Sequence, residues 1–327
     1  MIEMYLGKLK ATGKFTSKDV LQGQLYVGQW EILWYLALVR FSTVDLISIA
    51  TGYTKSSLTD TYLKTLFNQF KLIERVELKL PLGATQTARS FYVLTNLGYK
   101  KLGIIPPKTS KYELAKLLSS EHTALVITLL SYFFRHDTMR HKGEREEIVK
   151  TEKNWQSILD DVRKEKAKEL IKQYGIGYAS SSAIKQFNSA VKGIPIPDIY
   201  FEFNPIAFPG LEELTYYGIE PGDIVFIEVE TGEHRKPQIE EKLERYNKSK
   251  WFFEKYLNNK NYALLFVVRS EQKKNTLDKW LKESSVAKLS HFPILQVTIE
   301  EMGEKLTRVK HLTRPKERKQ EGEEYPW

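Results

Sequence analysis

The sequence has no cysteine among its 327 residues. This absence excludes disulfide-stapled folds, thiol nucleophiles, cysteine-ligated zinc and iron–sulfur clusters, and it predicts a cytoplasmic protein. Long hydrophobic runs are also missing, because the longest ones, residues 33–39 and 125–134, fall short of the ~20 residues that a membrane-spanning helix needs. The opening stretch MIEMYLGKLK lacks the pattern of a signal peptide. We therefore expect no membrane among the partners of this protein.

Several motifs of DNA-processing enzymes are absent as well. No glycine-rich phosphate loop ending in Lys-Ser or Lys-Thr is present, which argues against an ATP-driven motor. Nor is there a paired-histidine cluster of the kind that rolling-circle relaxases use beside a catalytic tyrosine. His136 and His141 have no further ligand at a spacing suited to zinc, and we interpret both as surface residues.

Charge is the first positive feature of the chain. The formal net charge is +9, and residues 1–110 hold 14 Lys and Arg against 7 Asp and Glu, whereas the rest of the chain is nearly balanced. This asymmetry predicts an amino-terminal part that binds nucleic acid and a larger part with another task. Lysines that merely keep the surface hydrated are the alternative explanation.

The amino-terminal third has the pattern of three helices followed by a β-hairpin. Apolar residues recur at helical spacing over 27–41, a second helix ends at Gly52, and a third helix covers 56–70. Two segments of alternating pattern then flank a turn around Gly83. This order predicts a winged helix-turn-helix domain over residues 1–108.

The third helix would be the recognition helix of such a domain. Its inward-facing candidates, spaced three and four residues apart, are Leu63, Leu66, Phe67 and Phe70. The opposite side of the helix would face a major groove, and the wing would reach phosphates or a minor groove. Our DNA-binding candidates are Lys55, Ser57, Thr59 and Lys64 on the helix and Arg75, Lys79, Gln86 and Arg89 in or beside the wing. Because winged helices also mediate protein contacts, the fold alone would not establish DNA binding.

Residues 110–135 have a helical pattern that is too apolar for a surface helix. We expect this segment to form a bridging helix, within residues 109–145, between two domains. His122 lies in its middle, and a lone histidine on a buried helix is more often a packing residue than a ligand. Residues 312–327 form a charged tail with little to bury, which predicts disorder.

The carboxyl-terminal part, residues 146–311, has alternating helices and buried strands. A charged amphipathic helix over 154–174 precedes two apolar strands, a helix that begins at Pro237, and another long strand. A short strand around 214–217 would complete a hairpin between the first two strands. The order of helices and strands predicts an α/β domain.

Three acidic residues in this part, Asp198, Glu228 and Glu230, lie on or next to the predicted strands. Side chains alternate along a strand, so Glu228 and Glu230 share one face. Two carboxylates beside a hydrophobic sheet need compensation, and a divalent metal ion with oxygen ligands is a common one. If the strand after Asp198 neighbours that of Glu228, all three acids would bind one Mg²⁺ or Mn²⁺ ion. Such an ion would activate water to attack a phosphodiester.

The helix that begins at Pro237 supplies a basic candidate. Gln238, Lys242 and Tyr246 are four residues apart and form one stripe. If this stripe faces the acids, Lys242 would orient the attacking water or neutralise the phosphate in the transition state. A solvated, salt-bridged helix face is the alternative.

With these residues placed, the carboxyl-terminal part resembles the PD-(D/E)XK nuclease-like superfamily, which has a restriction-endonuclease-like fold. Pro197-Asp198 is similar to its PD element, and residues 228–230 are similar to its (D/E)XK element, with Glu230 where the superfamily normally has lysine. The resemblance implies that Lys242 supplies the lysine function from the following helix. It also implies that an acid of the first helix joins the site, for which the candidates are Glu152, Asp160 and Asp161.

More narrowly, the layout resembles the replication-relaxation family of plasmids and other mobile elements, which pairs a winged helix with a nuclease-like domain. The segments that carry this resemblance lie within residues 27–270 and are YVLTNLGYKKLG, SSEHTALVITLL, IPDIYFEF, FIEVETG and KLERY. Membership would imply a role at replication origins or in plasmid DNA processing.

We therefore expect a protein that binds double-stranded DNA and nicks or cleaves it with a divalent metal ion. Asp198 and Glu228 would bind the metal, Glu230 would assist, and Lys242 would steady the scissile phosphate. The first alternative is a regulator of replication or transcription on an inactive nuclease fold, which the missing lysine at position 230 favours. A protein-interaction adaptor is the second. Whether a homodimer brings two sites together, and thus permits double-strand cutting, is left open.

Overall fold

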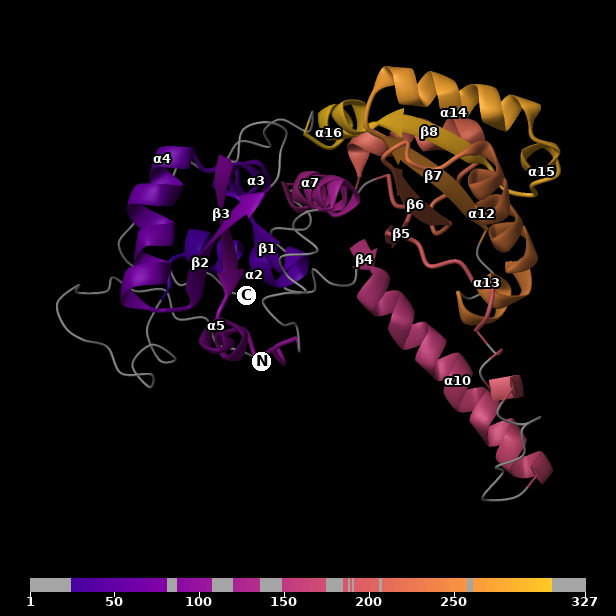
Figure 1. The fold of residues 1–327 in the computed structure, drawn as a ribbon, viewed down its shortest axis with the longest axis horizontal. Coiled ribbons are helices and arrows are strands. Elements are labelled where there is room, and N and C mark those ends of the chain that lie inside the picture. Colours follow the sequence, from indigo (N-terminus) through magenta and orange to yellow (C-terminus); the bar gives the residue numbers. More distant parts are fainter. Residues whose placement is uncertain are drawn as a thin grey trace.

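The chain forms a mixed α/β structure with two β-sheets (Figure 1). The computed structural model describes residues 25–80, 87–107, 120–135, 149–174, 185–187, 189, 191–205, 208–257 and 261–307. Across these residues, no helix combines the length and the apolar composition that crossing a lipid bilayer requires.

The amino-terminal unit consists of helices around a three-stranded antiparallel sheet of order β1-β3-β2. Its elements are α2 (Val27–Val39), β1 (Phe41–Ser42), α3 (Val44–Thr51), α4 (Lys55–Ser57), η1 (Leu58–Leu63), η2 (Thr65–Gln69), β2 (Ile73–Leu80), β3 (Thr87–Leu94) and α5 (Asn96–Lys101). Helix α3 ends, as the sequence predicts, at Gly52, whose left-handed φ of 75° is the conformation that glycine adopts without strain. The turn around Gly83 lies outside the described residues.

The third helix differs from the sequence prediction in its winding. Most of residues 58–69 are π-helical, and at its end the Phe70 amide donates to the Thr65 carbonyl at 3.1 Å. The buried side chains of this helix are Leu58, Leu63, Leu66 and Phe70. Phe67, which we expected to pack inward, is 38% exposed. That expectation is wrong for Phe67 alone, since Leu63, Leu66 and Phe70, which have the same spacings of three and four residues, are buried.

The rest of the described chain is built on a five-stranded sheet of order β4-β5-β6-β7-β8. Strands β4, β5 and β6 pair antiparallel, and β6, β7 and β8 pair parallel. The elements are α7 (Glu121–Arg135), β4 (Val149–Thr151), α10 (Glu152–Tyr174), β5 (Ile199–Glu202), η3 (Pro209–Tyr217), β6 (Ile224–Glu230), α12 (Lys236–Lys248), α13 (Lys250–Tyr256), β7 (Tyr262–Val268), α14 (Glu271–Glu283), α15 (Ser285–Lys288), β8 (Ile294–Thr298) and α16 (Ile299–Thr307). One face of the sheet packs on α7, η3 and α16, and the other on α10, α12, α13 and α14.

The predicted short strand at 214–217 is instead part of the 3₁₀ helix η3. Leu211 and Leu214 are both buried, because residues three apart lie on the same face of a helix with three residues per turn. The antiparallel neighbour of β5 on the side away from β6 is β4, which precedes α10 in the chain. The prediction of a strand here is therefore wrong.

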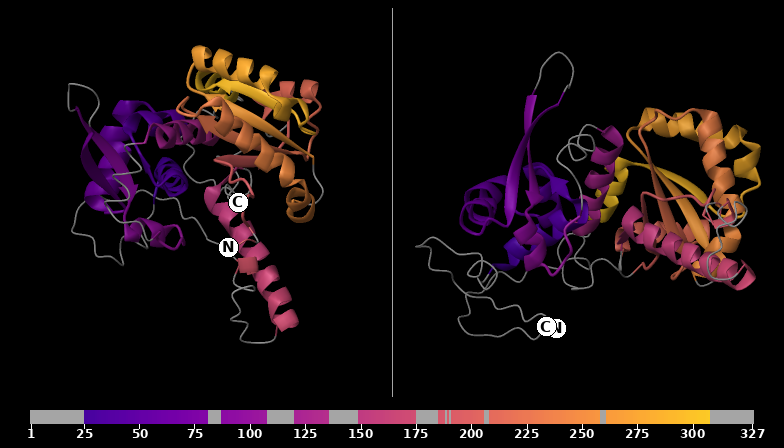
Figure 2. Two further views of the ribbon diagram at one scale, coloured as in Figure 1. Left: turned by 45° about the vertical axis from the view of Figure 1, so that its right-hand side comes forward. Right: turned by 60° about the horizontal axis from the view of Figure 1, so that its bottom comes forward.

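Helix α7 lies between the two sheets and packs against both parts of the molecule (Figures 1 and 2). Toward the amino-terminal unit, the buried Ser131 hydroxyl lies 2.7 Å from the Tyr35 hydroxyl of α2, which lies 2.9 Å from that of Ser42. Toward the five-stranded sheet, the Phe133 ring packs on Phe201, with centroids 5.5 Å apart. The two parts therefore share one apolar core through this helix.

Candidate carboxylate and lysine site

Asp198 lies next to β6, as a shared acidic site requires. It directly precedes β5, in which Ile199 pairs with Ile227. The Asp198 amide donates to the Ile227 carbonyl at 3.1 Å, and its Oδ2 accepts the Val229 amide at 2.8 Å. These two hydrogen bonds extend the pairing with β6 by one residue before β5 begins. They fix the Asp198 carboxylate beside β6.

Glu228 and Glu230 lie on one face of β6, and Lys242 of α12 bridges them. The two glutamates are only 4% and 3% exposed. Lys242 Nζ donates to Glu228 Oε2 at 2.8 Å and to Glu230 Oε1 at 2.6 Å. The solvated face of α12 is a different one, on which Glu241 pairs with Arg245. Lys242 therefore faces the acids rather than the solvent.

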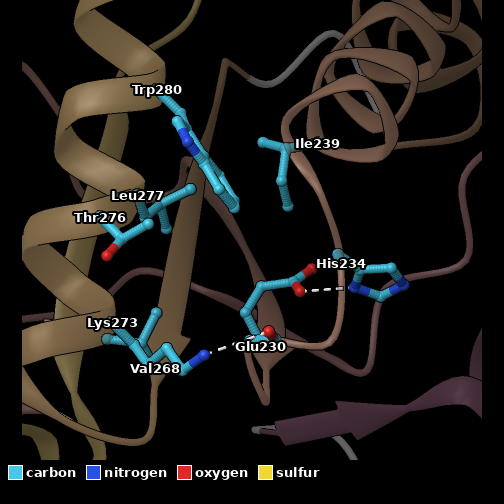
Figure 3. Close-up of a pocket in the computed structure, with 9 residues that line it drawn as sticks. Glu230, His234, Ile239, Val268, Lys273, Thr276, Leu277 and Trp280 are labelled. Carbon is cyan, nitrogen blue, oxygen red and sulfur yellow. Dashed lines mark hydrogen bonds and ion pairs between the residues drawn. The ribbon is translucent and has the colours of Figure 1, made fainter.

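Two further side chains complete the hydrogen bonding of the glutamates. The buried Tyr246 hydroxyl donates to Glu228 Oε1 at 2.7 Å. His234 Nδ1 lies 2.6 Å from Glu230 Oε2. Figure 3 shows Glu230 with His234 on one side and Lys273 of α14 on the other, where Lys273 donates to the Gly232 carbonyl at 3.2 Å. These residues border a small cavity of about 40 Å³, so little space remains beside Glu230.

His122 of α7 is a member of the site that sequence reasoning missed. Its Nε2 lies 3.1 Å from Asp198 Oδ2, and its side chain is 42% exposed. The expectation of a packing residue is wrong, because His122 is the second residue of the described helix and lies before the apolar run that the core buries. The spacing and composition of residues 110–135 gave no signal of this contact, since they placed His122 in the middle of the predicted helix.

Burial and charge act in opposite directions on the ionisable groups of the site. Burial raises the pKa of Glu228 above its ordinary value, although Lys242 opposes this shift. Burial alone would lower the pKa of Lys242, but the two glutamates outweigh it and raise that pKa above its ordinary value. Burial and Glu228 also raise the pKa of Tyr246 well above 10.0. Lys242 therefore stays an ammonium and Tyr246 a hydroxyl donor near neutral pH.

The pKa of His122 is raised above 6.5 by its hydrogen bond to Asp198, against the opposing effect of burial. The imidazole is therefore protonated at a higher pH than an exposed histidine would be. Three carboxylates and one ammonium give the site a net charge of −2 before the histidines are counted, which favours a cation.

The donors at the site suit Mg²⁺ or Mn²⁺, both of which prefer oxygen ligands. Both hydrogen bonds of the Asp198 carboxylate, with His122 and with the Val229 amide, are made by Oδ2. Among the described residues, none forms a hydrogen bond with Oδ1. Both oxygens of Glu228 and both of Glu230 are engaged. As the side chains lie, the described part of the chain contains no group of three or more His, Asp or Glu residues that could hold a metal ion. Asp198 Oδ1 is thus the oxygen of the three carboxylates that is most open to a ligand.

The acids proposed from the first helix do not reach the site where they are described. Asp160 and Asp161 are exposed and pair with Arg163 at 2.6 Å and Lys164 at 2.8 Å on their own helix. The side chain of Glu152 lies outside the described residues. The residue that α10 presents to the cleft beside Asp198 is Gln156.

The DNA-binding candidates lie on the exposed side of the amino-terminal unit where they are described. Lys55 is ion-paired with Asp45 at 2.5 Å, and Thr59 turns its hydroxyl to the Lys55 carbonyl. Ser57 and Lys64 are exposed. Arg75 contacts Glu77 at 2.7 Å and Ser90 at 3.0 Å. The side chains outside the described residues are those of Lys79, Gln86 and Arg89.

A comparison with protein-family models, curated proteins and solved structures finds no match for this chain. The functional argument therefore depends on the site itself. Strand β6, helix α12 and helix α7 bring together carboxylates, an ammonium and an imidazole, which are groups that bind cations and phosphates.

Proposed function

We propose that this chain is a DNA-binding protein that nicks or cleaves DNA by divalent-metal-dependent phosphodiester hydrolysis, in the replication or processing of a plasmid or other mobile element. The observation that carries the proposal is the ammonium of Lys242 within 2.8 Å of Glu228 and 2.6 Å of Glu230 on the strand next to Asp198. Buried charge clusters are costly and are concentrated at functional sites. The order PD, ExE and a helix-borne lysine also agrees with a PD-(D/E)XK nuclease-like domain.

The three carboxylates, Lys242 and Tyr246 each have a role in this proposal. Asp198 and Glu228 would hold Mg²⁺ or Mn²⁺, and the ion would supply an acidified water and positive charge beside the phosphate. Lys242 stays charged and contacts the scissile phosphate. Glu230 holds Lys242 in place, and Tyr246 orients Glu228. The helices and hairpin of the amino-terminal unit, as a winged helix-turn-helix, bind double-stranded DNA.

Incubation of the purified protein with supercoiled plasmid in Mg²⁺, Mn²⁺ or EDTA tests the proposal. We expect open-circular or linear products in metal and none in EDTA. Asp198→Ala should lower the rate at least about 100-fold and retain DNA binding. Asp160→Ala, which removes an exposed acid of the same domain, is the matched control and should cut like the wild type. Equal cutting by the Asp198→Ala variant would contradict the proposal.

A second function, a DNA-binding regulator on an inactive nuclease fold, is favoured by one specific observation. Lys242 occupies the space between Glu228 and Glu230, and Glu230 has both oxygens engaged. In this case the cluster is a structural ion pair. Band retardation without cutting in either metal, unchanged by Asp198→Ala, would establish this alternative.

A further inference from the structure

A cleft of about 420 Å³ begins at the candidate site and extends between the two parts of the molecule. Asp198 and His122 are among the residues that line it. The other walls come from the end of α2, β1, α7, the end of β4 and the start of α10. The carboxylate proposed to bind metal therefore opens into a space that the amino-terminal unit helps to enclose.

The walls of this cleft differ in chemistry. Phe41, Val126 and Leu130 give it an apolar wall. Arg40 and Gln156 line it with a guanidinium and an amide. An apolar wall suits the face of a nucleobase, an arginine suits a phosphate, and an amide suits the hydrogen-bonding edge of a base. The combination matches the base and the phosphate of a nucleotide.

The size of the cleft decides between duplex and single-stranded DNA. A volume of about 420 Å³ lies within the range of small-ligand pockets, and it is too small for a double helix. A cleft of this size admits a base only when it is unpaired, from single-stranded DNA or extruded from a duplex, as in enzymes that act on bases.

We infer that the cleft takes one unpaired nucleotide of a DNA strand, adjacent to the phosphate that lies at Asp198. This inference rests on the proposed function, since it assumes DNA as the substrate, and it specifies the substrate as single-stranded or locally opened DNA. The nucleotide stacks against the apolar wall beside Val126, and its phosphate pairs with Arg40.

The test measures binding of the full chain in EDTA by fluorescence anisotropy, with a labelled single strand and the duplex of the same sequence. Val126→Phe fills the cleft and should weaken single-strand binding at least about tenfold, with duplex binding within about twofold. Ala124→Phe, on an exposed position of the same helix, is the matched control and should change neither affinity. Equal affinities of Val126→Phe and wild type for the single strand would overturn the inference.

A second variant covers the case in which Val126→Phe misfolds, which circular dichroism would show. Arg40 is exposed, so Arg40→Gln should fold normally and weaken single-strand binding several-fold, with Arg40→Lys restoring part of it. Unchanged binding by Arg40→Gln would also overturn the inference. Because no metal is present, these results are independent of cleavage. A wild type that cuts plasmid but does not bind single strands would sink the inference and leave the proposed nuclease intact.

Discussion

Lys242 compensates two carboxylates that the sheet and α12 remove from water. Its removal would leave Glu228 and Glu230 buried, with Tyr246 and His234 as their remaining side-chain partners among the described residues. A buried charge without its counterion is far more costly than the intact pair is stabilising. The residue that the proposed chemistry needs is therefore also one that the fold needs, so stability and activity have to be measured separately.

We predict that Lys242→Met lowers the free energy of unfolding by about 3–5 kcal/mol near neutral pH. Burial raises the pKa of Glu228, so its protonated form is favoured in the folded state. The stability that protonation of Glu228 contributes is fully present below the ordinary pKa of 4.5, and it is lost as the pH rises through the raised pKa. The deficit of the variant should therefore shrink in acid. Urea unfolding across the pH range measures it.

The matched control for this variant is Lys248→Met, which removes an exposed lysine that pairs with Glu244 on the same helix. It should change the free energy of unfolding by less than about 0.5 kcal/mol at every pH. A pH-independent deficit in Lys242→Met would show that lost packing, rather than uncompensated charge, is the cause.

Part of the site was predictable from local periodicity. Residues that are two apart on a strand share a face, which places Glu228 beside Glu230. Residues that are four apart on a helix form one stripe, which aligns Lys242 with Tyr246. His122 was not predictable in this way, because it is 76 residues from Asp198 in the chain and the contact depends on how α7 packs between the sheets. Tertiary packing determines that contact, and no local pattern encodes it.

At the scale of elements, helix termini were more predictable than helix pitch. Gly52 ends α3 because one backbone conformation favours glycine there, which is a local property. The outward position of Phe67 and the 3₁₀ winding of η3 did not follow from the spacing of apolar residues. In η3, Gly210 lies against the backbone of Lys305 in α16, where a side chain would not fit. The sequence around Gly210 does not reveal this contact.

We predict that Gly210→Ala destabilises the protein by about 1–3 kcal/mol, because a Cβ would overlap the carbonyl oxygen of Lys305 and push η3 away from α16. Thermal unfolding followed by circular dichroism measures the loss. Glu212→Ala, an exposed change on the same 3₁₀ helix, should have little effect. Equal melting of Gly210→Ala and wild type would mean that η3 and α16 separate without cost.

At the scale of the whole molecule, the excess of positive charge in residues 1–110 is only partly available to a partner. Asp45 already pairs with Lys55, and Glu77 pairs with Arg75. Lys64 is exposed on the predicted recognition helix. The net charge of a region therefore overstates the number of phosphates that it can contact.

We predict that Lys64→Ala reduces the slope of log affinity against log salt for duplex DNA by about 0.9, which is the loss of one phosphate contact. Lys55→Ala should reduce it less, because Asp45 already neutralises that charge. Lys282→Ala, which removes a lysine paired with Asp278 on α14, is the control. A slope that falls as much for Lys282→Ala would locate the DNA on a different surface.

Helix α7 packs against both parts of the molecule, and this limits how the two parts can be exchanged by recombination during evolution. A recombination junction before Glu121 would separate Ser131 from Tyr35, and one after Arg135 would separate His122 from Asp198. Either exchange would leave a buried or partly buried polar group without its partner. We therefore expect the two parts to be inherited together, with new DNA preferences arising by substitutions on exposed residues rather than by the swapping of modules.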